Sequence, residues 1–378
     1  MNYSLSVEPL IKPELECDEI SLDRTAGLRE FYSVGVVLTV AYSMLSACAK
    51  APKYVAYTLN LEHLEKLTMK SIPHIDMSLY GKNFEAFAQT VGEGYEKNGF
   101  VALTNHGVDQ GLIDEALDIC RDLFALPEEV KKQYHIPGGG GARGYTPFGT
   151  EIAKDAKHVD LKEFWHVGRE VEGEPPYPQL TPNVWPKEMP EFKTKILRLY
   201  EALDDLGMQV LDALAVYLKQ PREYFRDKVQ LGNSILRPLH YPPIIDEGTP
   251  SVRAGAHEDI NVLTLLIGSR EPGLEVLAKD GSWIPVTIIE GAIICNVGDM
   301  LQRLTNGVLP STTHRVVNPP APFNSKSRYS IPFFLHFNPD FVIDPLESCI
   351  SDDNPKRFEA IGSHDFLLER LREIGLVK

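Results

Sequence analysis

The sequence has few cysteines, and no short spacing links them. Its 378 residues include five, at Cys17, Cys48, Cys120, Cys295 and Cys349, and no two of these form a Cys-x-x-Cys pair. This excludes the usual zinc ribbon and gives no support for a disulfide scaffold. Sparse, scattered cysteines are typical of proteins in a reducing compartment, so we expect a cytoplasmic location.

Positive charge is also scarce. The chain has 38 Lys and Arg against 53 Asp and Glu, a formal net charge of −15, and its pI is near 5.2. Nucleic acids and anionic membranes bind basic surfaces, so neither is expected as the main partner. An anionic small molecule is compatible with this balance if its pocket supplies a local basic residue.

Long hydrophobic runs are limited to one segment, residues 31–48. Its length is at the lower edge of what a membrane helix requires, and the acid-rich stretch before it is unlike the start of a secretory signal peptide. A signal anchor, a helix buried on the main domain and a peripheral extension are the three interpretations. We favour the last, because the globular pattern begins only near Ser71, and we predict that residues 1–66 form an N-terminal extension.

Three parts are predicted after this extension. Residues 67–190 form an N-terminal region of helices and strands, residues 191–340 a β-rich core with a backing helix, and residues 341–378 a C-terminal helical segment. Helical periodicity covers residues 83–97, 109–134 with an interruption at Pro127, 191–219 and 364–376.

After Asn233 the sequence pattern changes to short apolar segments separated by Gly and Pro. Asp280-Gly281 is a typical hairpin turn. The predicted strands cover residues 234–240, 262–267, 274–277, 284–286, 292–297, 313–317 and 329–337. Many short strands at close spacing indicate a double-sheet jelly roll or barrel. We therefore predict a mainly β fold with flanking helices and a distorted double-stranded β-helix (jelly-roll) core.

Potential metal ligands lie within this β-rich region. His257 and Asp259 are two residues apart, and on an extended strand such side chains point to the same side. A second histidine, His314, follows downstream. Two imidazoles and one carboxylate form the facial triad that holds non-haem Fe(II) with positions left open. The sequence therefore predicts an iron site at these three residues.

The His-x-Asp spacing alone is weak evidence, because His74 and Asp76 repeat it. That pair lies on a different predicted strand and lacks the glycine, hairpin and distal-histidine context. We predict that it is structural.

From Ile72 to Phe337 the sequence resembles the isopenicillin N synthase-like superfamily of iron and 2-oxoglutarate-dependent oxygenases. The motifs are Ile-Pro-x-Ile-Asp at residues 72–76, Gly-Phe-x-x-Leu-Thr-Asn-His-Gly at residues 99–107 and Thr-His-Arg-Val around His314. Within that group it is more similar to uncharacterised bacterial members than to the defined plant or antibiotic enzymes.

The resemblance implies roles for individual residues. His257, Asp259 and His314 match the iron ligands. Arg328, Ser330 and Tyr241 match the residues that bind 2-oxoglutarate, the first two through its distal carboxylate. One position departs from the pattern, since Leu239 stands where many relatives have an asparagine that helps to hold the cosubstrate.

Several other residues are weaker candidates. Tyr145, Phe148, Lys162 and Trp165 lie where relatives approach the prime substrate. Arg315 is either a structural ion-pair partner or a pocket residue. Phe334 and His336 either line the cavity or belong to the core. Glu258 is expected to point away from the iron ligands, toward solvent or a nearby salt bridge.

The resemblance implies an Fe(II)- and 2-oxoglutarate-dependent dioxygenase that oxidises a small molecule and releases succinate and CO2. Hydroxylation is the default reaction, with desaturation, oxidative cyclisation and ethylene formation as alternatives from the same iron site. Dioxygen is the expected co-reactant and ascorbate a candidate stimulant. A non-catalytic jelly-roll binding protein is the alternative from another functional class.

Overall fold

The computed structural model describes residues 72–137, 142–151, 158–244, 249–268, 271–286 and 289–373. The predicted extension at residues 1–66, with its apolar run at 31–48, lies outside them and stays a prediction. No helix in these ranges is long and apolar enough to cross a membrane.

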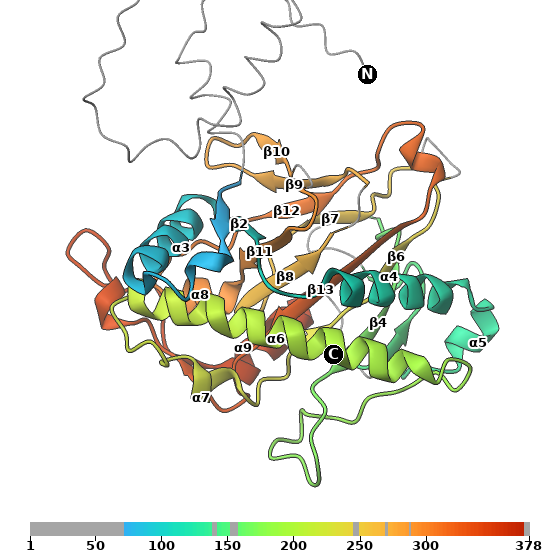
Figure 1. The fold of residues 1–378 in the computed structure, drawn as a ribbon, viewed down its shortest axis with the longest axis horizontal. Helices are drawn as coiled ribbons and strands as arrows, with labels where there is room; N and C mark the ends of the chain where they lie inside the picture. The colour runs from blue at the N-terminus through green and yellow to red at the C-terminus, as the bar shows by residue number, and fades with distance from the viewer. Residues whose placement is uncertain are drawn as a thin grey trace, which may run out of the picture. The chain divides into compact units, whose positions relative to one another are not determined.

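Within the described ranges, the larger sheet has nine strands in the order β1-β2-β11-β8-β13-β5-β4-β3, with β6 paired to both β13 and β4 (Figure 1). The strands are β1 (His74–Asp76), β2 (Phe100–Thr104), β3 (Gly144–Thr146), β4 (Glu163–Gly168), β5 (Ile235–Leu236), β6 (Leu239–Tyr241), β8 (Leu263–Ile267), β11 (Ile293–Val297) and β13 (Arg328–Leu335). All neighbours are antiparallel except β1 and β2.

The smaller sheet has the order β10-β9-β12-β7. Its strands are β7 (Ala254–His257), β9 (Leu274–Leu277), β10 (Trp283–Pro285) and β12 (His314–Val316). The predicted Asp280-Gly281 turn joins β9 to β10, and Gly281 has a φ of 82°, which a glycine adopts without strain. A separate pair, β14 (Val342–Ile343) and β15 (Ile361–Gly362), follows the core. The two larger sheets form the predicted double-stranded β-helix.

Three helices pack on the larger sheet: α3 (Phe84–Asn98), α4 (Gln110–Ala125) and α6 (Glu191–Tyr217) (Figure 1). Asn83 caps α3, because its side chain accepts a hydrogen bond from the backbone N–H of Ala86. Gly99 ends α3 with a φ of 67°, and a Cβ at that position would lie 2.2 Å from the carbonyl oxygen of Pro310. The chain must therefore leave α3 through a glycine before it enters β2.

The predicted second helix is interrupted at Pro127, as expected, and continues as the short α5 (Glu128–Lys132). Helices α3, α4 and α6 place their apolar stripes in one large hydrophobic core shared with the sheet. The members of that stripe on α6 are Ile196, Leu199, Leu203, Leu206, Val210 and Leu214, all buried. Fully burying a leucine is worth about 1.5–3 kcal/mol, so this helix is held mainly by its packing.

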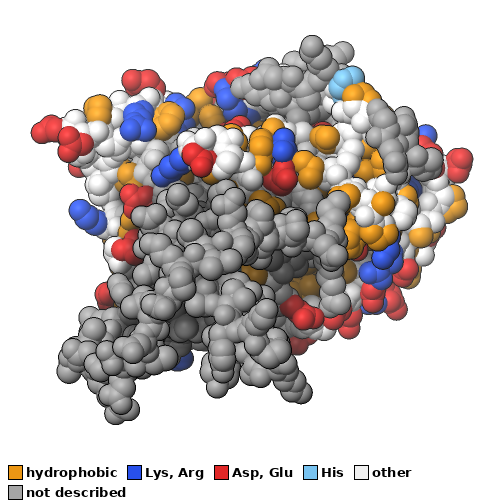
Figure 2. Space-filling model, turned by 90° about the horizontal axis from the view of Figure 1, so that it is seen from above, with side chains coloured by type: hydrophobic (Ala, Val, Ile, Leu, Met, Phe, Trp, Pro, Cys, Tyr) orange, Lys and Arg blue, Asp and Glu red, His pale blue; other side chains and the backbone are white. Residues whose placement is uncertain are grey.

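Two smaller apolar clusters occupy other parts of the β structure. One includes Phe100, Val276 and Ile294, and the other includes Leu239 and Tyr241. Where Figure 2 shows described residues, acidic and basic side chains are interspersed with hydrophobic ones rather than gathered by sign.

The structure differs from the sequence prediction at several elements, among them β14 and β15, which lie within the predicted C-terminal helical segment. The predicted strand 234–240 is two strands, β5 and β6, because Pro238 interrupts the ladder. Strand β4 was not predicted, since all six of its residues are buried and no polar alternation marks it. Asp299 begins a short helix, α8 (Asp299–Leu304), in a stretch for which no helix was predicted. The remaining short helices are α7 (Arg226–Val229) and α9 (Ser363–Glu373).

Candidate active site

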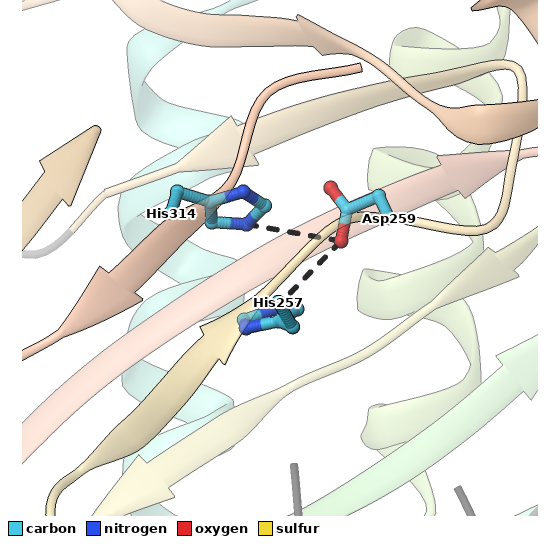
Figure 3. A group of neighbouring side chains, drawn as sticks. All are labelled: His257, Asp259 and His314. Atoms are coloured by element: carbon cyan, nitrogen blue, oxygen red, sulfur yellow. Dashed lines mark ion pairs between the residues drawn. The ribbon is translucent and has the colours of Figure 1, made fainter. Parts of the chain in front are cut away.

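The structure brings the three predicted metal ligands together (Figure 3). Nε2 of His257 lies 3.9 Å and Nε2 of His314 3.8 Å from Oδ1 of Asp259. One ligand atom from each residue lies within 4.8 Å of the others, which is close enough for a single ion to contact all three. No other group of three His, Cys, Asp or Glu residues in the described ranges meets that condition.

Strand pairing positions the two histidines. His314 on β12 is the register partner of His257 on β7, so their side chains start from neighbouring positions of the smaller sheet. Strand β7 ends at His257, however, and Asp259 lies just beyond it. The prediction that both residues lie on one extended strand was therefore wrong, although their side chains still converge.

Backbone carbonyls fix the histidine rings. Nδ1 of His257 lies 2.7 Å from the carbonyl oxygen of Gly255, and Nδ1 of His314 lies 3.1 Å from that of Thr312. Each Nδ1–H can only donate to its carbonyl, which leaves Nε2 with a lone pair for a metal. Burial, with the nearby His314, lowers the pKa of His257 to about 4, so this ring is neutral at pH 7. The donor set fits Fe(II), which neutral imidazoles and a carboxylate bind.

Asp259 is held from the other sheet. Its Oδ2 accepts hydrogen bonds from Thr264 Oγ1 on β8 at 2.6 Å and from Asn296 Nδ2 on β11 at 2.8 Å, which leaves Oδ1 facing the histidines. Burial by itself would raise the pKa of Asp259, but the two histidines and these two donors outweigh it and lower the pKa. The carboxylate is therefore ionised before any metal binds.

Replacing Asn296 by leucine is expected to weaken iron binding about tenfold to hundredfold, because losing a hydrogen bond that orients a metal ligand typically has this effect. Iron titration of the metal-free variant, followed by competition with a chelator, measures the change. Asn354→Leu serves as the control, because Asn354 donates a hydrogen bond to the carbonyl of Cys349 and does not contact the triad. Asn261→Leu is unsuitable, because Asn261 donates to Thr264, which itself holds Asp259. Unchanged affinity in Asn296→Leu would show that Thr264 alone orients the carboxylate.

The predicted cosubstrate residues also lie together. Arg328 and Ser330 are two apart on β13 and both are buried, with Arg328 Nη1 3.3 Å from Ser330 Oγ. Tyr241 on β6 is the register partner of Arg328, and the guanidinium lies 5.0 Å from the centre of its ring. Leu239, the departure from the family pattern, is the register partner of Ser330 and packs in the cluster with Tyr241.

A cavity of about 430 Å³ opens beside the triad. Its polar and charged lining residues include Glu151, Asp160, Lys162, His166, Asn233, Arg237, Glu258, Asn261, Asp299, Thr313 and His336. Apolar contacts come from Ile235 and Phe334 on the larger sheet and from Leu367 and Leu371 on α9. Of the two interpretations left open for Phe334 and His336, the structure supports the cavity lining.

The charges of this lining are paired with one another. Lys162 Nζ lies 2.5 Å from Glu151 and 2.8 Å from Asp160, and Arg237 lies 3.6 Å from Glu151. Burial opposes the charge of Lys162, but the two carboxylates outweigh it and raise its pKa; burial likewise opposes the charge of Glu151, but Lys162 and Arg237 lower its pKa. Asp160 also accepts the backbone N–H of Gly255 at 2.9 Å, so the cluster adjoins the carbonyl that orients His257.

Arg237 was missed by the sequence analysis. Its guanidinium packs over Phe164 and Phe334, at 4.4 and 4.9 Å from the ring centres, and its Nε donates to Nε2 of His166. The signal that could have found it is the following Pro238. A proline inside a strand pattern marks a break in the ladder, and such breaks redirect neighbouring side chains.

Other candidates lie elsewhere. Trp165 and Tyr145 are buried, Trp165 against Phe192 in the core and Tyr145 with its hydroxyl on Glu163, and neither is part of the cavity wall. Phe148 is 47% exposed and is not among the residues of the wall either. Of the four predicted substrate residues, only Lys162 lines the cavity.

The remaining expectations concern charged residues around the site. Arg315 forms a salt bridge with Glu275 at 2.7 Å, which confirms the structural interpretation. Glu258 is exposed at the cavity edge and accepts a hydrogen bond from Thr313. In the other His-x-Asp pair, Asp76 caps a short 3₁₀ turn and His74 is exposed, so this pair is structural as predicted.

The buried histidines give the metal-free protein a pH-dependent stability. Burial lowers the pKa of His336 to about 4 from an ordinary 6.5. The unfolded chain therefore takes up a proton that the folded protein does not, and stability falls as the pH drops from about 6.5 to about 4. This histidine changes the free energy of unfolding by at most about 1.4 kcal/mol per pH unit. Denaturant unfolding with a chelator present should show a shallower fall for His336→Gln. If the free energy of unfolding fell equally steeply with pH in the wild type and in His336→Gln, a lowered pKa of His336 would be contradicted.

Comparison with known proteins agrees with this site. A model of the non-haem dioxygenase in morphine synthesis N-terminal region matches residues 72–188, and one of the 2OG-Fe(II) oxygenase superfamily matches residues 232–337. A 2-oxoglutarate-Fe(II) type oxidoreductase of Emericella nidulans is 32% identical over 78% of this chain and 88% of the relative. A homoarginine-6-hydroxylase of Arabidopsis thaliana is 30% identical over 74% and 89%.

The chain is also similar to solved structures. A 2OG-Fe(II) oxygenase family protein from Caulobacter crescentus is 52% identical with a TM-score of 0.75, covering 80% of this chain and 99% of that one. A full-length Neurospora crassa protein in complex with alpha-KG is 31% identical with a TM-score of 0.71, covering 80% and 95%.

Fold, triad and relatives together define an iron- and 2-oxoglutarate-dependent oxidoreductase. The chain belongs to the 2OG-Fe(II) oxygenase superfamily, and Fe(II) and 2-oxoglutarate are its cofactors.

Proposed function

We propose that this protein hydroxylates a small polar molecule with Fe(II), 2-oxoglutarate and dioxygen, and releases succinate and CO2. The observation that carries the proposal is the position of the triad, whose residues His257 and Asp259 are part of the wall of the 430 Å³ cavity. A molecule in that cavity lies next to the metal ligands.

Each group of residues has a distinct task in this proposal. His257, Asp259 and His314 hold the metal from one side, and the bound iron with its cosubstrate and dioxygen supplies the oxidising chemistry. Arg328 and Ser330 hold the distal carboxylate of 2-oxoglutarate. The cavity wall orients the substrate and excludes water, so that the bond to be oxidised faces the iron.

The lining of the cavity indicates the class of substrate. Lys162, Arg237, Glu151 and Asp160 neutralise one another, so the wall offers hydrogen bonds without a large excess of either charge. Phe334 provides an apolar surface beside them. A neutral or zwitterionic polar molecule fits this combination. The Neurospora crassa structure with thymine, 30% identical, supports a small neutral substrate. Homoarginine, named for other relatives, is a small polar molecule too, but a cationic one.

The same iron chemistry also serves desaturation, cyclisation and ethylene formation, and no feature of the cavity favours these over hydroxylation. The non-catalytic alternative is set aside, because the triad is intact and the relatives are oxidoreductases and hydroxylases.

Succinate release tests the proposal. Iron-loaded protein with 2-oxoglutarate, ascorbate and air is screened against small polar compounds, including pyrimidines and amino acids, and ¹⁸O₂ is used with any compound that stimulates release. Hydroxylation predicts one succinate per product and one labelled oxygen atom in that product. Succinate release without oxygen in the product would contradict hydroxylation, and no succinate under any condition would contradict the oxygenase assignment.

A further inference from the structure

A second buried arginine, Arg253, lies beside the cosubstrate residues. It immediately precedes β7, and its side chain is fully buried, with 0% exposure. Its Nη2 donates to the backbone carbonyl of Lys326 at 3.0 Å, and its backbone N–H donates to Asn318 Oδ1 at 3.1 Å. Lys326 precedes Arg328 by two residues, so the guanidinium of Arg253 reaches the segment that leads into the Arg328/Ser330 pair.

The other donors of Arg253 have no partner. Its Nε and Nη1 are buried without a hydrogen bond, as is Nε of Arg328. In the described part of the chain, no carboxylate forms an ion pair with either guanidinium. Burial, with a further contribution from the charge of Arg328, lowers the pKa of Arg253 to about 10, although Tyr241 and Glu271 oppose this.

Arg253 and Arg328 are thus both buried without a carboxylate partner, and the charge of Arg328 acts on Arg253. A buried charge without a partner is strongly destabilising, and a neighbouring like charge adds to the cost. An anion that binds between them removes both penalties. A carboxylate has two oxygens with about four sites for hydrogen bonds, so it can accept from two arginines and a serine hydroxyl at once.

We propose that Arg253 is a second cosubstrate-binding residue, which pairs with the distal carboxylate of 2-oxoglutarate together with Arg328 and Ser330. This inference rests on the proposed placement of that carboxylate at Arg328 and Ser330. The competing explanation is that Arg253 only fixes the chain around Lys326 and Asn318. In that case its loss changes stability but not the choice between oxo acids.

The test compares two cosubstrate analogues that differ only at the distal end. 2-Oxopentanoate has the same five-carbon chain and keto acid as 2-oxoglutarate but lacks the second carboxylate. Calorimetric titration of each compound into Mn(II)-loaded protein gives two dissociation constants for the wild type and for the variants Arg253→Gln, Arg328→Gln and Arg169→Gln. Arg169 is the matched control, a largely buried arginine that is fully paired with Asp204.

Arg253→Gln is expected to weaken 2-oxoglutarate binding about tenfold to hundredfold, the usual effect of losing a hydrogen bond to a charged group. Its affinity for 2-oxopentanoate should change less than about threefold, which is below the effect of one such bond. The Arg169→Gln protein should keep the wild-type preference for 2-oxoglutarate. If Arg253→Gln does not fold, as judged by thermal unfolding, Arg253→Lys carries the same comparison with a smaller loss, because lysine keeps the charge but not the planar fork.

Equal weakening of both oxo acids, or no weakening, would overturn the role of Arg253. The preference for 2-oxoglutarate over 2-oxopentanoate could disappear in Arg328→Gln but persist in Arg253→Gln. That result would show that only Arg328 binds the distal carboxylate; it would reject the role of Arg253 and leave the proposed function intact. A wild-type protein that binds both oxo acids equally well would instead contradict the proposed cosubstrate site.

Discussion

Alanine at any one of His257, Asp259 or His314 is expected to abolish iron binding and 2-oxoglutarate turnover. The three ligand atoms lie within 4.8 Å of one another, and a metal held from one side by three protein ligands cannot lose one without loosening. The weakening should exceed the roughly tenfold to hundredfold loss expected when a residue that only orients a ligand is removed. Iron content after desalting and succinate release are the two measurements.

The control for this experiment is His74→Ala. His74 belongs to the other His-x-Asp pair, is exposed and has no role in the triad, so iron content and turnover should remain at the wild-type level. Iron lost in His74→Ala but retained in His257→Ala would reverse the choice between the two pairs.

Lysine in place of Arg328 should raise the concentration of 2-oxoglutarate required by about tenfold to hundredfold. The guanidinium offers two parallel charge-assisted hydrogen bonds to a carboxylate, which the single ammonium group of lysine does not reproduce. Loss of one hydrogen bond to a charged group costs about 1.5–3 kcal/mol, which corresponds to that factor. Iron content should stay nearly unchanged, because Arg328 lies outside the triad. The dependence of succinate release on 2-oxoglutarate concentration measures the effect.

Arg315→Lys is a suitable control, since Arg315 is next to His314 in sequence yet pairs with Glu275. It should leave the requirement for 2-oxoglutarate unchanged. An unaltered requirement in Arg328→Lys would contradict the assignment of Arg328 to the cosubstrate and would point to a carboxylate of the prime substrate as its partner.

The triad and the helices could be predicted because local patterns determine them. The apolar period fixed α3 and α6 to within two residues, and Asn83 and Gly99 marked the ends of α3. The iron ligands were found from residue type and spacing, even though Asp259 lies past the end of its strand. The His-x-Asp spacing still identifies the ligands although the strand ends at His257, because hydrogen bonds from Thr264 and Asn296 orient the Asp259 carboxylate toward the histidines.

The cavity wall could not be predicted, because tertiary contacts decide it. Trp165 and Lys162 lie on neighbouring stretches of chain, yet one packs in the core and the other meets Glu151 beside the triad. Arg237 reaches the wall only because Pro238 separates β5 from β6. Arg253 carries no sequence pattern of its own, and only its burial without partners sets it apart.

The triad also has a mechanical consequence. His257 and His314 belong to the smaller sheet, whereas Asp259 is fastened through Thr264 and Asn296 to the larger one. An ion bound by all three residues would therefore cross-link the two sheets. Ligand binding to the folded state opposes opening of the region it joins. Amide hydrogens of β7 and β12 should accordingly exchange with solvent more slowly in the iron-loaded enzyme, while those of α6 on the outer face of the larger sheet should be little affected.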